Sequence, residues 1–257
     1  MKKMIVAAIM AVFAMNAMAQ NDYIKRNRPY SANSIIYDES KKETSEIKNT
    51  DKSWYRYDDL QNGMWFFGVG AGAHYYIGDH NRQAKLKDAL GATFDVYGGY
   101  WFNTTSGLRL SLHGYNTHGV TNYNTNPYKY GAKDYIGNNG DKQYRQKFNF
   151  YSVNVEYMLN LSQLFCKEGV VKRYNAIPYI GVTYCHMLSD GDGKGTILKN
   201  YSWGISGGLL NTYKLSRLFD LTLDIHANTV SEEFDSDTGK RVGEGTIGAS
   251  LGLNVHL

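Results

Sequence analysis

The last stretch of the chain, GTIGASLGLNVHL, alternates between two kinds of residue. Ile247, Leu251 and Val255 belong to an apolar series, whereas the residues between them, such as Ser250 and Asn254, are small or polar. A period of two predicts a β-strand with one apolar face and one small, polar face. The same alternation begins at Met64 and recurs along the chain, and we predict eight such strands from it.

The predicted strands are long, and most have ten or more residues. This length suits a tilted membrane-crossing strand of about 9–11 residues better than a soluble strand of about 5–6. The connections also alternate in character. Long or polar connections fall at 79–90, 121–146, 189–199 and 235–242, short ones at 103–107 and 216–219, and an intermediate one at 162–175. Long loops outside and short turns in the periplasm are typical of outer-membrane barrels.

An apolar strand face that continues to the chain end is explained if it contacts lipid. A sheet in hydrocarbon must close on itself, because unpaired edge groups would be costly there. The predicted fold class is therefore all-β, an eight-stranded antiparallel up-and-down transmembrane β-barrel with a flexible N-terminal extension. A soluble sandwich or lipocalin-like barrel, the alternative, would turn the aliphatic faces inward. Aromatic girdles are expected at the strand ends, from Trp65, Tyr75, Tyr76, Tyr100, Trp101, Tyr201, Trp203, Tyr213 and Phe219.

Three parts of the chain are predicted. Residues 1–19 read as a signal peptide, with Lys2 and Lys3 before an apolar run and Ala17-Met18-Ala19 before the cleavage point. Residues 20–63 are charged and lack apolar periodicity, so a flexible periplasmic extension is expected, and 64–257 form the barrel. The net charge of +4 falls to +2 once Lys2 and Lys3 are removed, and no long basic run points to nucleic acid.

Charged residues occur on the predicted inward faces of several strands. We predict a barrel-interior charged network of Asp95, Arg109, His113, Glu156, Lys214, Asp224 and His226, with Asp220 on the same face. The interior of an eight-stranded barrel is just wide enough for its own side chains, and buried charges must pair. A plugged interior is the first hypothesis. A narrow ion or solute path is the second, because inward glycines leave some room.

Several stretches resemble a known family. MWFFGVGAGAHYYIGD, LGATFDVYGGYWFNTTSGLRLSLHGYNTHG, FNFYSVNVEYMLNLSQLF and RYNAIPYIGVTY resemble the barrel of Bacteroidota-type outer-membrane proteins related to the outer membrane protein A family. The resemblance covers residues 64–257 and implies the same eight-stranded barrel. The family's C-terminal peptidoglycan-binding domain is not expected, since the chain ends at its eighth predicted strand. Leu257 stands where the family usually has an aromatic residue.

Motifs for catalysis, cofactors and metals are weak. His226-Ala227-Asn228 is faintly similar to lipid A deacylases, but Ala227 stands where their serine would be, so no enzyme is predicted. SDGDGKG at 189–195 resembles the start of a calcium loop, but Lys194 and Tyr201 occupy ligand positions. Gly68 to Gly72 lies within a strand, which excludes a dinucleotide loop. The seven His are scattered in sequence, so neither a metal site nor a cofactor is predicted.

Three roles remain open at this stage. The first is a structural, envelope-integrity or surface-interaction barrel, the second a small porin-like channel, and the third an accessory subunit of a larger outer-membrane complex. The expected partners are outer-membrane lipopolysaccharide and phospholipid, the barrel-insertion machinery through the C-terminal strand, and a protein bound through the extension or the external loops. Cys166 and Cys185 are expected to be free thiols, because one strand separates them.

Overall fold

The computed structural model describes residues 63–78, 84–124, 126–138, 140–165, 172–188, 200–216, 218–230 and 244–257. The predicted signal peptide, the extension up to residue 62, the segment 189–195 and Cys166 lie outside the described residues. Cys185 is described, and it is a buried free thiol.

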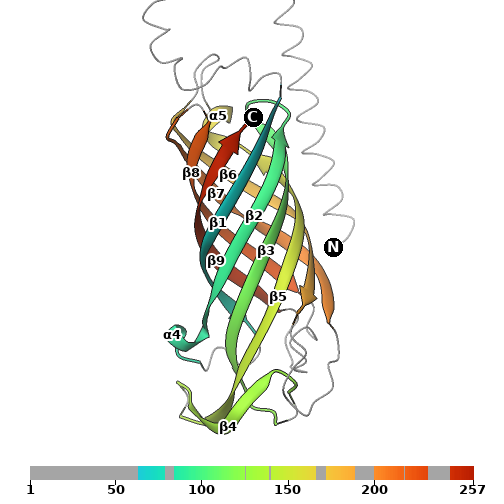
Figure 1. The fold of residues 1–257 in the computed structure, drawn as a ribbon, viewed down its shortest axis with the longest axis vertical. Helices are drawn as coiled ribbons and strands as arrows, with labels where there is room; N and C mark the ends of the chain where they lie inside the picture. Colours follow the sequence, from blue (N-terminus) through green and yellow to red (C-terminus); the bar gives the residue numbers. More distant parts are fainter. Residues whose placement is uncertain are drawn as a thin grey trace, which may run out of the picture. The chain divides into compact units, whose positions relative to one another are not determined.

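The described chain consists almost entirely of β-strands (Figure 1). The strands are β1 (Met64–Ile77), β2 (Leu90–Trp101), β3 (Ser106–Thr121), β4 (Lys129–Ile136), β5 (Lys142–Leu159), β6 (Tyr174–Met187), β7 (Tyr201–Lys214), β8 (Phe219–Val230) and β9 (Glu244–His256). Two helices of four residues each accompany them, α4 (Leu86–Ala89) and α5 (Leu161–Leu164). Neither of these helices has the length or the apolar character to cross a membrane.

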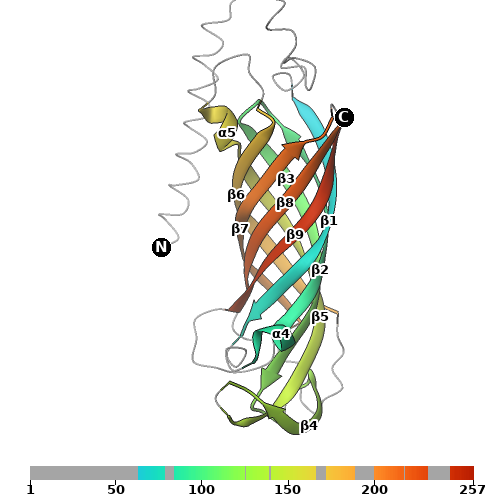
Figure 2. The ribbon, with the colours of Figure 1, turned by 90° about the vertical axis from the view of Figure 1, so that its left-hand side faces the viewer.

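Eight of the strands form a closed ring. The order around the ring is β1-β2-β3-β5-β6-β7-β8-β9, and β9 pairs with β1 to close it, whereas β4 pairs only with β5. All neighbours are antiparallel. Figures 1 and 2 show the strands tilted around one axis. Since each of the eight ring strands has two partners, the ring itself has no open edge, and the predicted eight-stranded antiparallel barrel is confirmed.

The two faces of the ring differ as the sequence pattern predicts. On β8, Leu221, Leu223 and Ile225 are 39–44% exposed on the outside, whereas Thr222 and Asp224 between them are 2–3% exposed. Aliphatic side chains therefore cover the outer wall and polar side chains fill the lumen. A soluble barrel with aliphatic faces inside is excluded, because this chain has the opposite arrangement.

Two residues of the predicted aromatic girdles point into the lumen instead. Tyr76 is fully buried and donates a hydrogen bond to Glu244, and Trp101 is 6% exposed and packs against Phe66 with ring centroids 5.9 Å apart. The girdle assignment was wrong for both, because it followed their position at a strand end and not their parity. Tyr76 shares the inward parity of His74 on β1.

The polar segment 121–146, predicted as one external loop, contains further strand structure. β3 runs to Thr121, β5 begins at Lys142, and β4 lies between them and pairs with β5 through a register shift between Tyr130 and Tyr135. The β3–β5 hairpin therefore extends past its neighbours and carries β4 at its tip (Figure 1). We call this the β4 end of the barrel, and the opposite end, where β1 begins and β9 ends, the terminal end.

Candidate functional site

Arg109 lies at the centre of the barrel interior and is completely buried. Its Nε donates to Oε2 of Glu156 at 2.6 Å, and its Nη1 donates to Oδ2 of Asp224 at 2.9 Å. The guanidinium lies over the rings of Tyr179 and Tyr97, with Cζ 4.0 and 5.1 Å from the two centroids. We call these five residues the arginine layer. Each charge in it has a hydrogen-bonded partner of opposite sign, as burial in low dielectric requires.

The arginine layer joins opposite walls of the barrel. β3, which carries Arg109, and β8, which carries Asp224, are four strands apart in either direction around the ring. Tyr179 on β6 also reaches Asp224, donating to Oδ1 at 2.7 Å, and Tyr97 on β2 donates to Thr222 at 3.3 Å. Side chains from β2, β3, β5, β6 and β8 therefore meet in the middle of the lumen and fill it at this level.

A second group of side chains lies four residues further along β3, toward the β4 end. His113 Nδ1 is 2.8 Å from Oδ1 of Asp95, and its ring centroid is 4.9 Å from that of His226. Asp95, His113 and His226 form what we call the histidine cluster. The Tyr115 ring stacks on His113 with a centroid distance of 6.0 Å. Asp95 and His113 are register partners on β2 and β3, whereas His226 comes from β8 on the opposite wall.

Ser111 connects the arginine layer to the histidine cluster. Its Oγ donates to Oε2 of Glu156 at 3.2 Å and lies 3.0 Å from Nε2 of His113. Asn154 Nδ2 donates to the same hydroxyl at 3.0 Å. The two groups therefore belong to one continuous hydrogen-bond network in the lumen.

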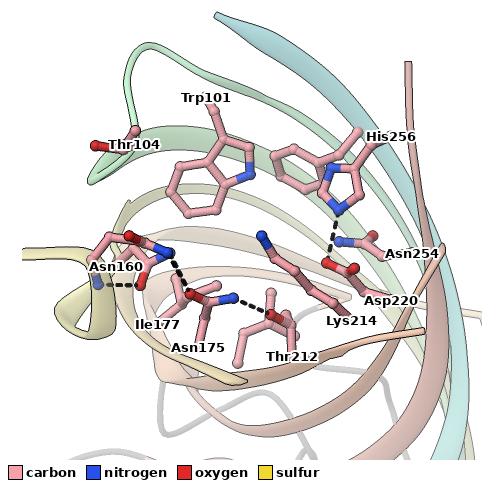
Figure 3. A pocket seen from close by; sticks show the side chains of 13 residues that line it. Trp101, Thr104, Asn160, Asn175, Ile177, Thr212, Lys214, Asp220, Asn254 and His256 are labelled. Carbon is pink, nitrogen blue, oxygen red and sulfur yellow. Dashed lines mark hydrogen bonds and ion pairs between the residues drawn. The ribbon is translucent and has the colours of Figure 1, made fainter. Parts of the chain in front are cut away.

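Lys214 and Asp220 lie apart from this network, at the terminal end. They line a small cavity of about 30 Å³, in which Asp220 accepts a 2.8 Å contact from Nε2 of His256 (Figure 3). Asn160, Asn175 and Thr212 form a chain of hydrogen bonds at the opposite side of this cavity. Of the seven residues predicted for the interior network, the structure brings six together in the middle of the lumen and places Lys214 at its terminal end.

Several residues of the network could not be assigned from sequence. Tyr97, Tyr179 and Ser111 have inward parity, but uncharged residues carry no signal for a charged network. Asp95, His113 and His226 were all predicted for the interior network, but their meeting in one cluster was not, since His226 is more than a hundred positions from the other two in the chain. Parity indicates that each faces the lumen, but their equal height along the barrel axis follows only from strand register.

A wider cavity of about 300 Å³ lies at the β4 end, outside the ring. Its lining combines α4, the start of β2, β3, β4 and β5 and includes basic, acidic and aromatic side chains, among them Lys87, Asp88, His118, Tyr135 and Arg145. Arg145 lies over the ring of Tyr135 with Cζ 5.6 Å from the centroid. This end therefore presents polar and cationic groups together with aromatic rings.

The closed ring and its outer wall define the class of protein. A closed barrel pairs every backbone group, a broad aliphatic wall requires a nonaqueous solvent, and strands of 12–18 residues in the ring are long enough to cross a bilayer. Exposed Trp65 and Phe219 at one end of the wall and Tyr201 and Trp203 at the other are typical of interfacial aromatic residues. The chain is a transmembrane β-barrel of the outer-membrane type.

Comparisons with known proteins add no family to this class. No protein-family model and no curated protein matches the chain. Among solved structures, it is similar to OprG of Pseudomonas aeruginosa, with 11% identity and a TM-score of 0.45 over 77% of this chain and 97% of OprG. It is also similar to Ail, the attachment invasion locus protein of Yersinia pestis, with 11% identity and a TM-score of 0.43 over 77% of this chain and 100% of Ail.

A third similar structure is the N-terminal β-barrel domain of Pseudomonas aeruginosa OprF. It shares 12% identity and has a TM-score of 0.42 over 77% of this chain and 98% of that domain. The class of the present chain rests on its own strand pairing and outer wall, and not on these likenesses.

The deacylase alternative finds no support at His226. This histidine points into the lumen and is 2% exposed, whereas Ala227 stands beside it on the outer face. A serine nucleophile at that position would be needed to act on lipid. The described residues around His226 therefore offer no lipid-facing Ser–His pair.

Proposed function

We propose that this protein is a structural barrel of the outer membrane that serves envelope integrity or surface interaction and has no enzymatic activity. The observation that carries the proposal is the arginine layer. Arg109 is fully buried, pairs with Glu156 and Asp224 and lies between two tyrosine rings. An ion path through this level would have to separate charges that are paired in low dielectric, which is costly.

We further propose that the terminal end faces the periplasm and the β4 end faces outward. The connection at 102–105, between β2 and β3 at the terminal end, is short, and the Asn103 side chain accepts hydrogen bonds from Thr105 and Ser106 that hold it. Short turns are typical of the periplasmic side of outer-membrane barrels. The predicted extension at 20–63 would then lie in the periplasm, where a protein partner could bind it.

The β4 end supports a surface-interaction role. Lys129 and Lys133 lie over the ring of Tyr144, with Nζ 4.7 and 5.8 Å from its centroid, and the 300 Å³ cavity, lined by Tyr135 and Arg145, lies at the same end. Cationic groups held against aromatic rings suit anionic surface partners such as lipopolysaccharide. Two other partners are proposed, phospholipid around the outer wall and the barrel-insertion machinery at β9. The resemblance to Bacteroidota-type proteins stays a prediction.

Single-channel recording tests the proposal against a porin-like channel. The folded full chain, checked by its heat-dependent gel mobility, is inserted into a planar bilayer and compared with Arg109→Met. We expect the wild-type barrel to be silent. Discrete openings whose ion selectivity changes in Arg109→Met would contradict the structural role and favour a channel. Co-purification with and without residues 20–62 tests the accessory-subunit role, which a partner lost with the extension would support.

A further inference from the structure

Three side chains of ligating chemistry converge at the histidine cluster. Asp95, His113 and His226 each offer one potential ligand atom, and these atoms lie within 4.8 Å of one another. All three residues are at most 2% exposed. We propose that they bind one divalent transition-metal ion, with Zn²⁺ as the test ion, inside the lumen. Two imidazole nitrogens and a carboxylate oxygen are ordinary ligands for such an ion.

His226 is the residue whose surroundings point to a ligand. Neither of its ring nitrogens has a hydrogen-bond partner among the described residues, although the side chain is 2% exposed. Buried polar groups normally have partners, because a buried group without one has lost its hydrogen bonds to water and gained none in return. Gly248 on β9 lets this ring pack closely against the backbone of β9, because a Cβ there would lie 2.7 Å from Nε2 of His226. A metal ion bound to His226 would satisfy one of the two nitrogens.

The hydrogen bonds around His113 leave its Nδ1 as the coordinating atom. The hydroxyl proton of Ser111 goes to the Glu156 carboxylate, so Ser111 Oγ can accept a proton from Nε2 of His113 at 3.0 Å. In a neutral ring the Nδ1 lone pair then faces the Asp95 carboxylate at 2.8 Å, so that either a proton on Nδ1 or a bound metal cation is needed to relieve the repulsion between the two atoms. Small rotations would separate the two atoms to the roughly 3.3 Å that bonds of about 2.0–2.1 Å to one Zn²⁺ require.

The charge of the central network favours a divalent cation. Asp95, Glu156 and Asp224 contribute three negative charges and Arg109 one positive charge, which leaves −2 when the histidines are neutral. All four residues are at most 3% exposed, so solvent does not compensate this charge. One divalent ion at the histidine cluster would bring the network to neutrality.

A bound ion would link strands on opposite walls of the barrel. His113 on β3 and His226 on β8 are four strands apart around the ring, as Arg109 and Asp224 are. Tyr115 and Phe150, with ring centroids 4.6 Å apart, lie on the β4 side of the cluster, and the arginine layer lies on the other side. We expect the ion to enter while the barrel folds and to stay bound afterwards. This inference goes beyond the structural role proposed above and does not depend on it.

Refolding the full chain with zinc tests the site. The chain is unfolded in urea with chelator, refolded in detergent micelles with Zn²⁺, freed of excess metal, and checked for folding by gel mobility. We expect one retained zinc per folded barrel and an X-ray absorption spectrum that shows two imidazoles with oxygen ligands and no sulfur. A folded barrel that retains no zinc, or zinc with a different ligand set, would overturn the proposal.

A pair of histidine variants locates the ion. In His226→Gln we expect zinc affinity to fall more than tenfold. His256→Gln is the matched control, because His256 also pairs with a buried aspartate in the lumen, Asp220 at 2.8 Å, and should keep wild-type affinity. Equal affinity in the two variants would place the zinc elsewhere and overturn the proposal. Asp95→Asn replaces His226→Gln if the latter does not fold, and the wild-type spectrum decides independently of any variant.

Discussion

Arg109 and Glu156 are directly opposite each other on β3 and β5, and the Arg109 Nε donates to Glu156 Oε2 at 2.6 Å. The same guanidinium reaches Asp224 on the opposite wall at 2.9 Å. Both contacts lie in a lumen where these side chains are at most 4% exposed. The charged plug is therefore built from one cross-strand pair and one contact across the barrel.

Removing the arginine should destabilise the barrel strongly. Arg109→Met leaves Glu156 and Asp224 buried without their cation, and breaking a buried pair from one side typically costs about 3–5 kcal/mol. The free energy of unfolding in urea, followed by gel mobility and tryptophan fluorescence, measures this loss. Arg145→Met is the control, since Arg145 is exposed at the β4 end, and it should change stability by less than about 0.5 kcal/mol.

Neutralising the carboxylates together with the arginine should recover much of that loss. The triple variant Arg109→Met, Glu156→Gln, Asp224→Asn removes the uncompensated charges, and replacing a whole buried ion cluster is often close to neutral. The same urea unfolding measures it. If the triple variant is no more stable than Arg109→Met alone, the loss came from packing between Tyr97 and Tyr179 and not from unpaired charge.

A charged substitution on the outer wall should destabilise the barrel only where the wall contacts lipid. Leu112 is 46% exposed at mid-strand on β3, and Leu112→Arg should cost roughly 2–4 kcal/mol when the barrel is folded in lipid vesicles. Ile136 on β4 is more exposed, at 53%, but lies outside the ring, so Ile136→Arg should cost less than about 0.5 kcal/mol. Equal costs for the two variants would contradict a membrane-embedded wall.

Gly181 should tolerate no side chain. A Cβ at this position would collide with the Val155 carbonyl and lie 2.7 Å from Cα of Glu156, on the strand that pairs with β6. Gly181→Ala should therefore cost about 1–3 kcal/mol through backbone displacement. Gly114→Ala is the matched control, because the nearest atom, the Phe94 carbonyl oxygen, is 3.8 Å away. Urea unfolding should rank the two variants in that order, and the reverse order would contradict the register.

Tyr135 should hold β4 against the segment that precedes β2. Its hydroxyl accepts a hydrogen bond from Lys85 N at 2.9 Å and donates to Asp88 at 3.1 Å, and burial raises the pKa of Tyr135, which keeps the donor proton in place. Tyr135→Phe should leave the stability of the eight-stranded ring unchanged and speed amide exchange in β4 roughly thirtyfold, because two hydrogen bonds of about 1 kcal/mol each are lost. Tyr130→Phe, with its ring 42% exposed, is the control and should not change exchange.

The alternation of residues was sufficient to predict the ring and its two faces. Because side chains in a strand point to opposite faces with a period of two, Asp224 between Leu223 and Ile225 can only be inside if its neighbours are outside. The same rule, applied to Tyr76 and Trp101, would have placed them in the lumen. The girdle assignment was wrong for these two residues because it used their position at a strand end instead of their parity. β4 was missed because its segment lacks a clear apolar face.

The sequence by itself thus determined that the described chain forms a membrane-spanning barrel with a charged interior, since parity and strand length are local properties. Only the tertiary structure decided which charges meet. The heights of Arg109, Asp224, His113 and His226 along the axis depend on strand register and on closure of β9 against β1, which join residues more than a hundred positions apart. That closure makes Arg109 the centre of a plug, puts Lys214 at the terminal end, and brings Asp95, His113 and His226 together.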